Sequence, residues 1–284
     1  MLLFFVFFLL LFLSFINFCV LDYFIWWSVF VICTFVFVFM VYSVSVCNVG
    51  CLINYYIIQE VCGYYFLLFD SWKLQFLFLM LKSGSSPFHF WVFSVLSGLK
   101  KWSVLWFLTL QKLPYFVVLV NFCSDFFFFF LFFGMIVCYF QFFLLRNYCD
   151  LLFVGSTESF NWLLLLGVFS FNEVFFLFFF YYFVMFFIVF YVYSGFINLF
   201  SLEMLMVFFN VPLTITFFLK VLLLFGSGFL VGFYYYFLLL VMPLMSLGVG
   251  YLFFLVSMLG FNYGLKYYDY FVWVLFCVGF LSYF

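Results

Sequence analysis

Uninterrupted apolar runs of about 20 residues follow one another along this chain, and they limit what it can fold into. The first run, "LLFFVFFLLLFLSFINFCV", begins directly after Met1. Of the 284 residues, 73% are hydrophobic and 6% are charged, whereas soluble domains average roughly 45–50% apolar and about 25% charged residues. A membrane β-barrel would instead show alternating segments of about 10 residues, which this sequence lacks. The sequence therefore predicts an all-α membrane protein.

The interruptions between the apolar runs predict about eleven transmembrane helices in a single polytopic domain, residues 1–284. The first run has no basic region before it and no cleavage site after it, so we interpret it as a span and not as a signal peptide. We expect a bend near Pro243 in the long tenth span. The predicted spans are residues 2–20, 23–44, 53–69, 72–93, 102–121, 126–145, 151–170, 174–193, 202–225, 229–258 and 270–283.

Basic residues are concentrated in alternate connectors between these spans. The connectors after the even-numbered spans carry Lys100, Lys101, Arg146 and Lys266, and the opposite connectors carry only Lys73. Basic connectors stay on the cytoplasmic or matrix side of a membrane. The charge pattern therefore predicts that the N-terminus lies on the matrix side.

The composition is unusual even for a membrane protein, with 62 Phe, 22 Tyr, only four Pro and no Ala. Membrane helices normally pack through small residues, so selection on packing does not explain the loss of Ala. A coding strand rich in T and poor in C does explain it, which indicates an organelle genome, most simply a mitochondrial one. Each Lys, His, Pro or Gln that persists under such a bias is therefore informative.

Other classes of protein find no support in the sequence. Of the nine cysteines, Cys47 and Cys51 are the closest pair, no C-x-x-C occurs, and His89 is the only histidine. These spacings disfavour a metal site or a disulfide framework. A nucleic-acid partner is not expected either, because the chain has no basic patch.

Three lysines fall inside predicted spans: Lys82, Lys112 and Lys220. A charge at the bilayer centre costs roughly 2.5–3.5 kcal/mol on insertion scales, so such residues are usually functional. Lysine suits proton transfer, because its amine gives up the proton more readily once it leaves water. The alternative is that each lysine extends to the headgroups from near a span end.

Helix-breaking residues accompany two of these lysines. Residues 84–87, "GSSP", follow Lys82, and Asn210 and Pro212 precede Lys220. Broken helices at membrane depth are tolerated where they line a cavity or are buried in protein, and they often mark an ion path. The sequence therefore predicts two broken helices.

Two carboxylates and the histidine complete the candidate proton-path residues. Glu60 lies mid-span, with Tyr56 and Tyr64 on the same helical face. Glu158, in "GSTESFNW", either takes part in the path or only belongs to a hydrogen-bonded polar turn. His89 either relays protons or satisfies the broken backbone.

Several stretches resemble the chain 2 family of respiratory complex I, the proton-pumping NADH:ubiquinone oxidoreductase. "KSGSSPFHFWVFSVLSGL" resembles the family pattern K-L-G-x-A-P-F-H-x-W-V-P-E-V-x-x-G, and "LTLQKL" resembles L-L-T-W-Q-K-L. "VGSTESFNWLLL" and "NVPLTITFFLKVLLL" resemble two further motifs, Y-S-S-I-x-H-M-G-W and G-x-P-P-L-x-G-F-x-x-K-W, more weakly. The order and spacing of the motifs agree along nearly the whole chain.

The resemblance implies an antiporter-like fold in the membrane arm, with Lys82, Lys112 and Lys220 as the proton-path lysines. It implies no bound cofactor and no redox chemistry in this chain. The expected partners are other membrane-arm subunits, including neighbouring antiporter-like ones, and lipids such as cardiolipin. Eleven spans match a shortened form of the family that lacks three N-terminal helices and begins in the matrix.

One departure from the family concerns the glutamate that should pair with the first lysine from the second span. That span, "FIWWSVFVICTFVF", has no carboxylate. We hypothesise that Glu60, one helix later, replaces it as the partner of Lys82, which requires the two charges to lie within about 8 Å or to share a water. Two other interpretations stay open: a stand-alone cation/proton antiporter, and a structural subunit of the same arm that moves no protons.

Overall fold

The computed structural model describes residues 2–44, 49–99, 102–145 and 147–168, and beyond them single residues and short pieces between 174 and 251. Within these residues every element is a helix. Three helical stretches are long and apolar enough to cross a membrane: Tyr23–Ser43, Trp102–Phe122 and Asp125–Leu144. The described part is thus the all-α membrane protein that the apolar runs predicted.

The first nine α-helices and two 3-10 turns run in chain order from the N-terminus to residue 167. Their bounds are α1 Leu2–Cys19, α2 Tyr23–Val44, α3 Val49–Leu68, α4 Trp72–Ser83, α5 Phe90–Leu96, α6 Trp102–Leu108, η1 Leu110–Lys112, α7 Leu113–Phe122, η2 Asp125–Phe127, α8 Phe128–Leu144 and α9 Tyr148–Gly167.

These helices correspond to the first seven predicted spans. The observed and predicted ends agree within three residues for α1 and α2, and α3 begins four residues before its predicted start. The predicted span 72–93 covers α4 and the first half of α5, which ends three residues later. The predicted span 102–121 covers α6, η1 and all but the last residue of α7. The predicted eighth to eleventh spans, with Asn210, Pro212 and the bend near Pro243, lie mostly outside the described residues.

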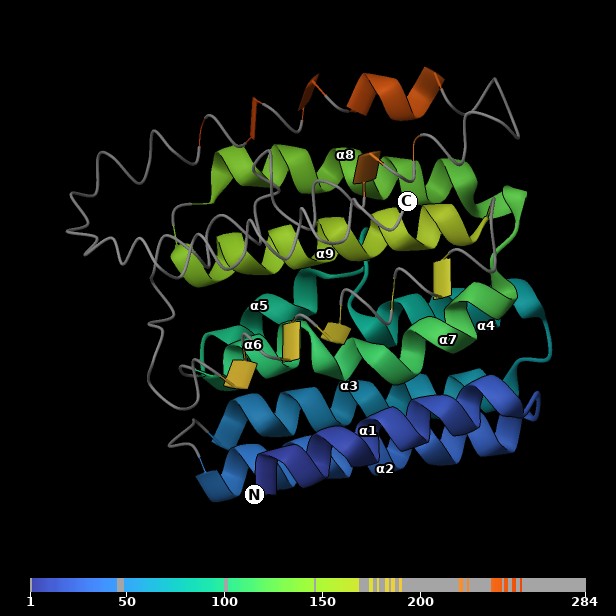
Figure 1. Ribbon diagram of the computed structural model, residues 1–284, viewed down its shortest axis with the longest axis vertical. Coiled ribbons are helices and arrows are strands. Elements are labelled where there is room, and N and C mark those ends of the chain that lie inside the picture. Colours follow the sequence, from blue (N-terminus) through green and yellow to red (C-terminus); the bar gives the residue numbers. More distant parts are fainter. Residues whose placement is uncertain are drawn as a thin grey trace, which may run out of the picture.

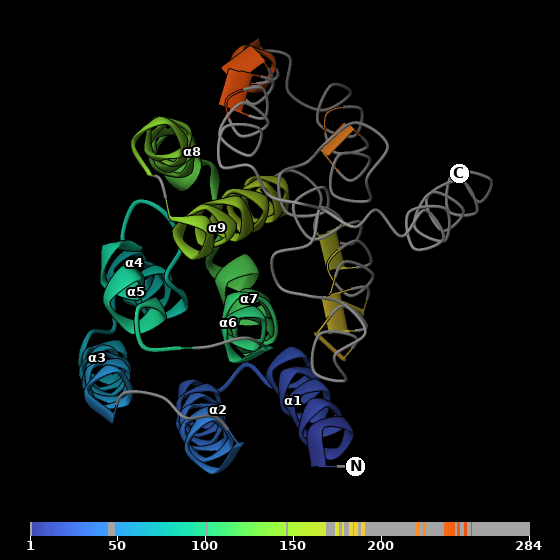
Figure 2. The ribbon, with the colours of Figure 1, turned by 90° about the vertical axis from the view of Figure 1, so that its left-hand side faces the viewer.

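The helices run roughly parallel or antiparallel to one another (Figure 1), and in the end-on view the α6 and α7 segment lies inside the bundle (Figure 2). Residues 102–120 of the segment Trp102–Phe122 are all buried, although the segment is apolar enough to cross a membrane. α7 packs against α1, α2, α4 and α9. This segment is therefore the centre of the bundle, and it carries Lys112.

The α4 helix ends at Ser83 because the next residue, Gly84, adopts the left-handed conformation with φ 64°. This conformation is cheap only for glycine, and it is common at helix ends. Residues 84–89 are not helical, and α5 begins at Phe90. A non-helical segment therefore lies between Lys82 and His89.

The central segment is also interrupted, between α6 and α7. Thr109 separates α6 from the 3-10 turn η1, and α7 starts at Leu113, directly before Pro114. Proline has no N–H to donate and crowds the carbonyl of residue i−4, here Leu110, so a regular helix does not continue through it. Lys112 is therefore held on a 3-10 turn at the centre of the bundle and not on a regular α-helix.

Candidate functional site

Lys82 lies in the last turn of α4 and is buried. Its ammonium nitrogen Nζ lies 5.0 Å from the ring centre of Phe30 and 6.0 Å from that of Tyr115, distances at which a cation interacts with an aromatic ring. A Cβ added to Gly63 would lie only 3.1 Å from this Nζ. The absence of a side chain at Gly63 therefore makes room for the ammonium beside α3.

Three carbonyl groups at the broken end of α4 find donors. Met80 O accepts from the Ser85 N–H at 3.0 Å and from the Ser83 hydroxyl at 3.1 Å. Leu81 O accepts from the Trp91 indole at 2.9 Å. Lys82 O accepts from the Gln59 amide at 2.8 Å. Because unpaired carbonyls are costly inside a membrane, these bonds stabilise the interruption at this depth.

Two tyrosines and two glutamines join α3 to the central segment, and we call Tyr55, Gln59, Gln111 and Tyr115 the tyrosine–glutamine clasp. Gln111 Nε2 donates to the Tyr55 hydroxyl at 2.9 Å, and the Tyr115 hydroxyl donates to Gln59 Oε1 at 3.2 Å. All four side chains are buried. Gln59 also donates to Lys82 O, so the clasp connects the central segment to the broken end of α4.

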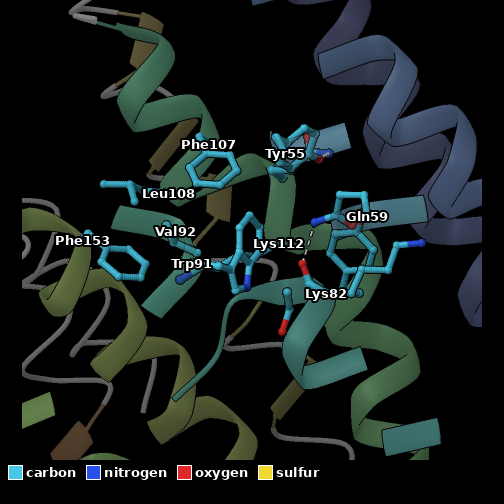
Figure 3. Close-up of a pocket in the computed structure, with 12 residues that line it drawn as sticks. Tyr55, Gln59, Lys82, Trp91, Val92, Phe107, Leu108, Lys112 and Phe153 are labelled. Atoms are coloured by element: carbon cyan, nitrogen blue, oxygen red, sulfur yellow. Dashed lines mark hydrogen bonds between the residues drawn. The ribbon is translucent and has the colours of Figure 1, made fainter. Parts of the chain in front are cut away.

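A small cavity lies at the clasp, and Lys82 and Lys112 are among the residues that line it (Figure 3). Its room for the centre of a water molecule is about 10 Å³, close to the minimum of about 10–15 Å³ that one buried water needs. The carbonyl Oε1 of Gln111, a lining residue, has no hydrogen-bond partner in the described part of the chain. Two lysines and an unpaired acceptor thus share a cavity of the size of one water.

Lys112 extends from the central segment toward α9. Its Nζ donates weakly to the backbone oxygen of Ser156 at 3.4 Å and lies 3.5 Å from the Ser156 hydroxyl. The ring of Phe160 lies 5.2 Å away. No described carboxylate lies within 4 Å of this ammonium. Among the residues that the structure describes, the partners of Lys112 are therefore neutral, and it lines the cavity as well as contacting α9.

Glu158, in α9, forms an ion pair with Lys220, and both side chains are almost completely buried. The same carboxylate accepts from the Tyr139 hydroxyl at 2.5 Å and from the Trp162 indole at 2.8 Å. The Lys220 Nζ also lies 5.8 Å from the Trp162 ring. A buried charge of this kind is tolerated when it is both paired and hydrogen-bonded, and Glu158 meets both conditions.

Glu60 is half-buried in α3. Its carboxylate oxygens lie more than 4 Å from the Lys82 ammonium, so the two residues form no direct ion pair. It lies near enough for an electrostatic interaction with that lysine. Its helical neighbour Gly63 is the residue beside the Lys82 ammonium. The two charges are therefore neighbours without direct contact, and their pairing through a water stays a hypothesis.

His89 is fully buried directly before α5, and its Nε2 lies 2.5 Å from the Gln141 Oε1. Because the amide oxygen can only accept, Nε2 carries the proton in this contact. The Asn161 amide of α9 donates to Ser86 O in the same broken segment, at 3.3 Å. His89 and Asn161 therefore attach the broken segment to α8 and α9.

The buried polar groups follow one another through the bundle as a series. Gln59 of the clasp bonds to the backbone oxygen of Lys82, the clasp and Lys112 line the same cavity, and Lys112 contacts Ser156 on α9. Glu158, paired with Lys220, lies two residues after Ser156 on the same helix. The described residues contain no group of three His, Cys, Asp or Glu side chains that could hold a metal ion. The side chains gathered here are lysines, a carboxylate and hydroxyls, groups of the kind that can exchange protons.

Sequence reasoning did not single out the clasp or the pairing of Glu158 with Lys220. A signal for the clasp was present, since Tyr55 and Gln59, like Gln111 and Tyr115, are four residues apart and thus share a helical face. No comparable signal exists for the ion pair, because its members are 62 residues apart.

Comparison with known proteins identifies the family. No family model matches the chain. It is 43% identical to the NADH-ubiquinone oxidoreductase chain 2 of Ascaris suum over 212 residues, which cover 72% of this chain and 70% of that protein. It is 37% identical to the NADH-ubiquinone oxidoreductase chain 2 of Caenorhabditis elegans over 199 residues, which cover 69% of this chain and 70% of that protein. The extent and identity of these matches, together with the helical membrane architecture, show that the chain belongs to the NADH-ubiquinone oxidoreductase chain 2 family.

Proposed function

We propose that this chain translocates protons across the membrane, through its buried lysines, as one subunit of the respiratory NADH:ubiquinone oxidoreductase. Its family makes it a membrane subunit of respiratory complex I, with other subunits of that complex as partners. The observation that carries the proposal is the burial of Lys82, Lys112 and Lys220 in one helical bundle, where Lys82 and Lys112 line one cavity and Lys220 pairs with Glu158.

The energetic cost of these lysines argues for a functional role. Each ammonium buried in the membrane costs roughly 2.5–3.5 kcal/mol on insertion scales, and apolar residues would fill the same space at no such cost. A subunit with only a structural role has no need of three buried ammonium groups. A proton path, in contrast, needs groups that gain and lose a proton within the membrane.

In the proposed mechanism Lys112 is the central exchange group. Its amine accepts a proton from the side of the cavity and Lys82, and the resulting ammonium releases the proton toward Ser156 and α9. The charge on Lys82, modulated by Glu60, makes protonation of Lys112 easier or harder, because like charges repel across a low-dielectric cavity. Glu158 holds Lys220 at the far end of the series.

The finer features of the proposal follow the resemblance and the charge pattern. The chain has about eleven spans in an antiporter-like fold, with broken helices at residues 84–89 and at Asn210 and Pro212. Its N-terminus faces the matrix. It is organelle-encoded, lies in the mitochondrial inner membrane and contacts cardiolipin. It binds no cofactor, and quinone reduction takes place elsewhere in the complex.

Two alternative functions predict different observations. A stand-alone cation/proton antiporter would migrate alone or as a small oligomer on a native gel. The proposal predicts peptides of this chain, identified by mass spectrometry, in the megadalton band that stains for NADH dehydrogenase activity.

The second alternative is a structural subunit that moves no protons, and it predicts a dry cavity beside Lys112. The test is a density map of the intact complex at a resolution that shows ordered water. The proposal predicts at least one water between Lys82 and Lys112, hydrogen-bonded to Gln111. A well-ordered cavity without water would favour the structural role.

A further inference from the structure

The outward side of α3 differs from the outward sides of the helices around it. The exposed residues in the middle of α2 are Ile32, Phe35 and Phe39, and those of α8 are all Phe or Leu. Such surfaces suit lipid chains. On α3, in contrast, the outward side includes Asn54 and the half-buried Glu60.

Glu60 lies at the depth where a carboxylate is most costly. It is the twelfth of the 20 residues of α3, so at 1.5 Å per residue it lies about 17 Å from the start of the helix and about 12 Å from its end. It cannot reach the headgroups from there. An ionisable residue at this depth almost always faces protein or water and is paired.

No described residue hydrogen-bonds to the Glu60 carboxylate or forms an ion pair with it. Lys82 interacts with it only electrostatically, from the inner side of α3. On the outer side, Tyr56 and Tyr64 are 37% and 56% exposed, one helical turn to either side of Glu60. The side chains of Tyr56, Glu60 and Tyr64, which can all form hydrogen bonds, thus follow one another along one exposed face of α3. The exposed residues beside them, such as Ile57, are apolar.

We propose that the α3 face formed by Tyr56, Glu60 and Tyr64 is a subunit interface. Its occupant is a membrane helix of a neighbouring subunit that places a cationic or N–H donor side chain against Glu60. The charge of Glu60 selects this occupant: lipid chains offer no donor at this depth, whereas a protein helix does. The inference goes beyond the proposed proton path, because it holds whether or not protons move through this chain.

The charge of Glu60 also predicts whether a substitution at this position raises or lowers the yield of assembled complex. If Glu60 faced lipid, Glu60→Leu would remove a costly carboxylate and would increase the yield of assembled complex. If Glu60 accepts from a neighbouring subunit, the same change leaves that donor unpaired, which lowers the yield by about threefold or more. Glu60→Gln keeps an acceptor and should reduce the yield less. Ile57→Leu, on the same face, is the steric control and should leave the yield unchanged.

The test measures assembly of the intact complex on native gels of membranes that carry each variant, together with a density map of the wild-type complex. We expect a lower yield for Glu60→Leu and a donor of another subunit within hydrogen-bond distance of the carboxylate. An unchanged or higher yield, acyl-chain density on this face, or coverage by this chain's own C-terminal residues would overturn the inference. Because assembly is measured separately from proton translocation, failure of the interface is distinguishable from failure of the proton path.

Discussion

The Glu158 carboxylate pairs with the Lys220 ammonium inside the helical bundle, where their side chains are 1% and 2% exposed. Tyr139 and Trp162 donate to the same carboxylate. Lys82 and Lys112, in contrast, have no carboxylate of the described residues within 4 Å. The three buried lysines are therefore inequivalent: the charge of one is matched by a direct partner, and the other two line one small cavity.

Glu158→Gln tests the role of the ion pair. The change keeps the shape of the side chain but removes the charge that compensates Lys220, and removing one partner of a buried pair typically costs 3–5 kcal/mol. We expect a clear loss of assembled complex on native gels. The double variant Glu158→Gln with Lys220→Met removes both charges and should assemble better than Glu158→Gln alone, while its proton translocation stays low. Equal assembly of the single and the double variant would show that the two charges do not depend on each other.

Tyr115→Phe tests the tyrosine–glutamine clasp. It deletes the hydroxyl that donates to Gln59 and leaves a buried acceptor unpaired, at a cost of about 1–3 kcal/mol. We expect the midpoint temperature for heat inactivation of the complex to fall by a few degrees. Tyr65→Phe is the matched control, since that ring lies on the outer side of α3 and is 44% exposed. A control that lowers the midpoint as much as Tyr115→Phe would argue against the clasp.

Gly134→Ala tests the contact between α8 and the broken segment. A Cβ at this position would lie 2.7 Å from the backbone oxygen of Ser86, too close for either backbone to stay in place. Overpacking of this kind typically costs about 1–3 kcal/mol, so the variant should be less stable to heat. Gly50→Ala is the control, because nothing lies within 4 Å of its added Cβ. Unaltered stability of Gly134→Ala would mean that the broken segment is free to move away from α8.

The sequence predicted most of what depends on local pattern. Apolar runs set the ends of α1 and α2, and the small residues with Pro87 predicted the interruption after Lys82, where Gly84 takes the left-handed conformation. Both signals come from the physics of neighbouring residues, namely lipid burial and backbone conformation.

Other features could not be predicted because they depend on contacts between distant helices. The interruption at η1 was missed because the apolar run continues through it, although Pro114 marks the position. The partner of Glu158 is on a different helix, and helical periodicity does not indicate which helices pack together. The hypothesis that Glu60 is the partner of Lys82 stays a prediction, whereas among the described residues the lysine with a direct carboxylate partner is Lys220.

The most direct test of the proposed proton path is the number of protons translocated per NADH oxidised by the complex in sealed vesicles, compared between Lys112→Met and Lys73→Met. Methionine approximates the shape of lysine without its charge, and Lys73 is an exposed lysine at the start of α4, away from the buried series. The account predicts a lower ratio, or lower coupled turnover, for Lys112→Met, with NADH oxidation by the hydrophilic arm retained and with Lys73→Met equal to the wild type. An assembled Lys112→Met complex with unchanged turnover and an unchanged ratio would contradict it.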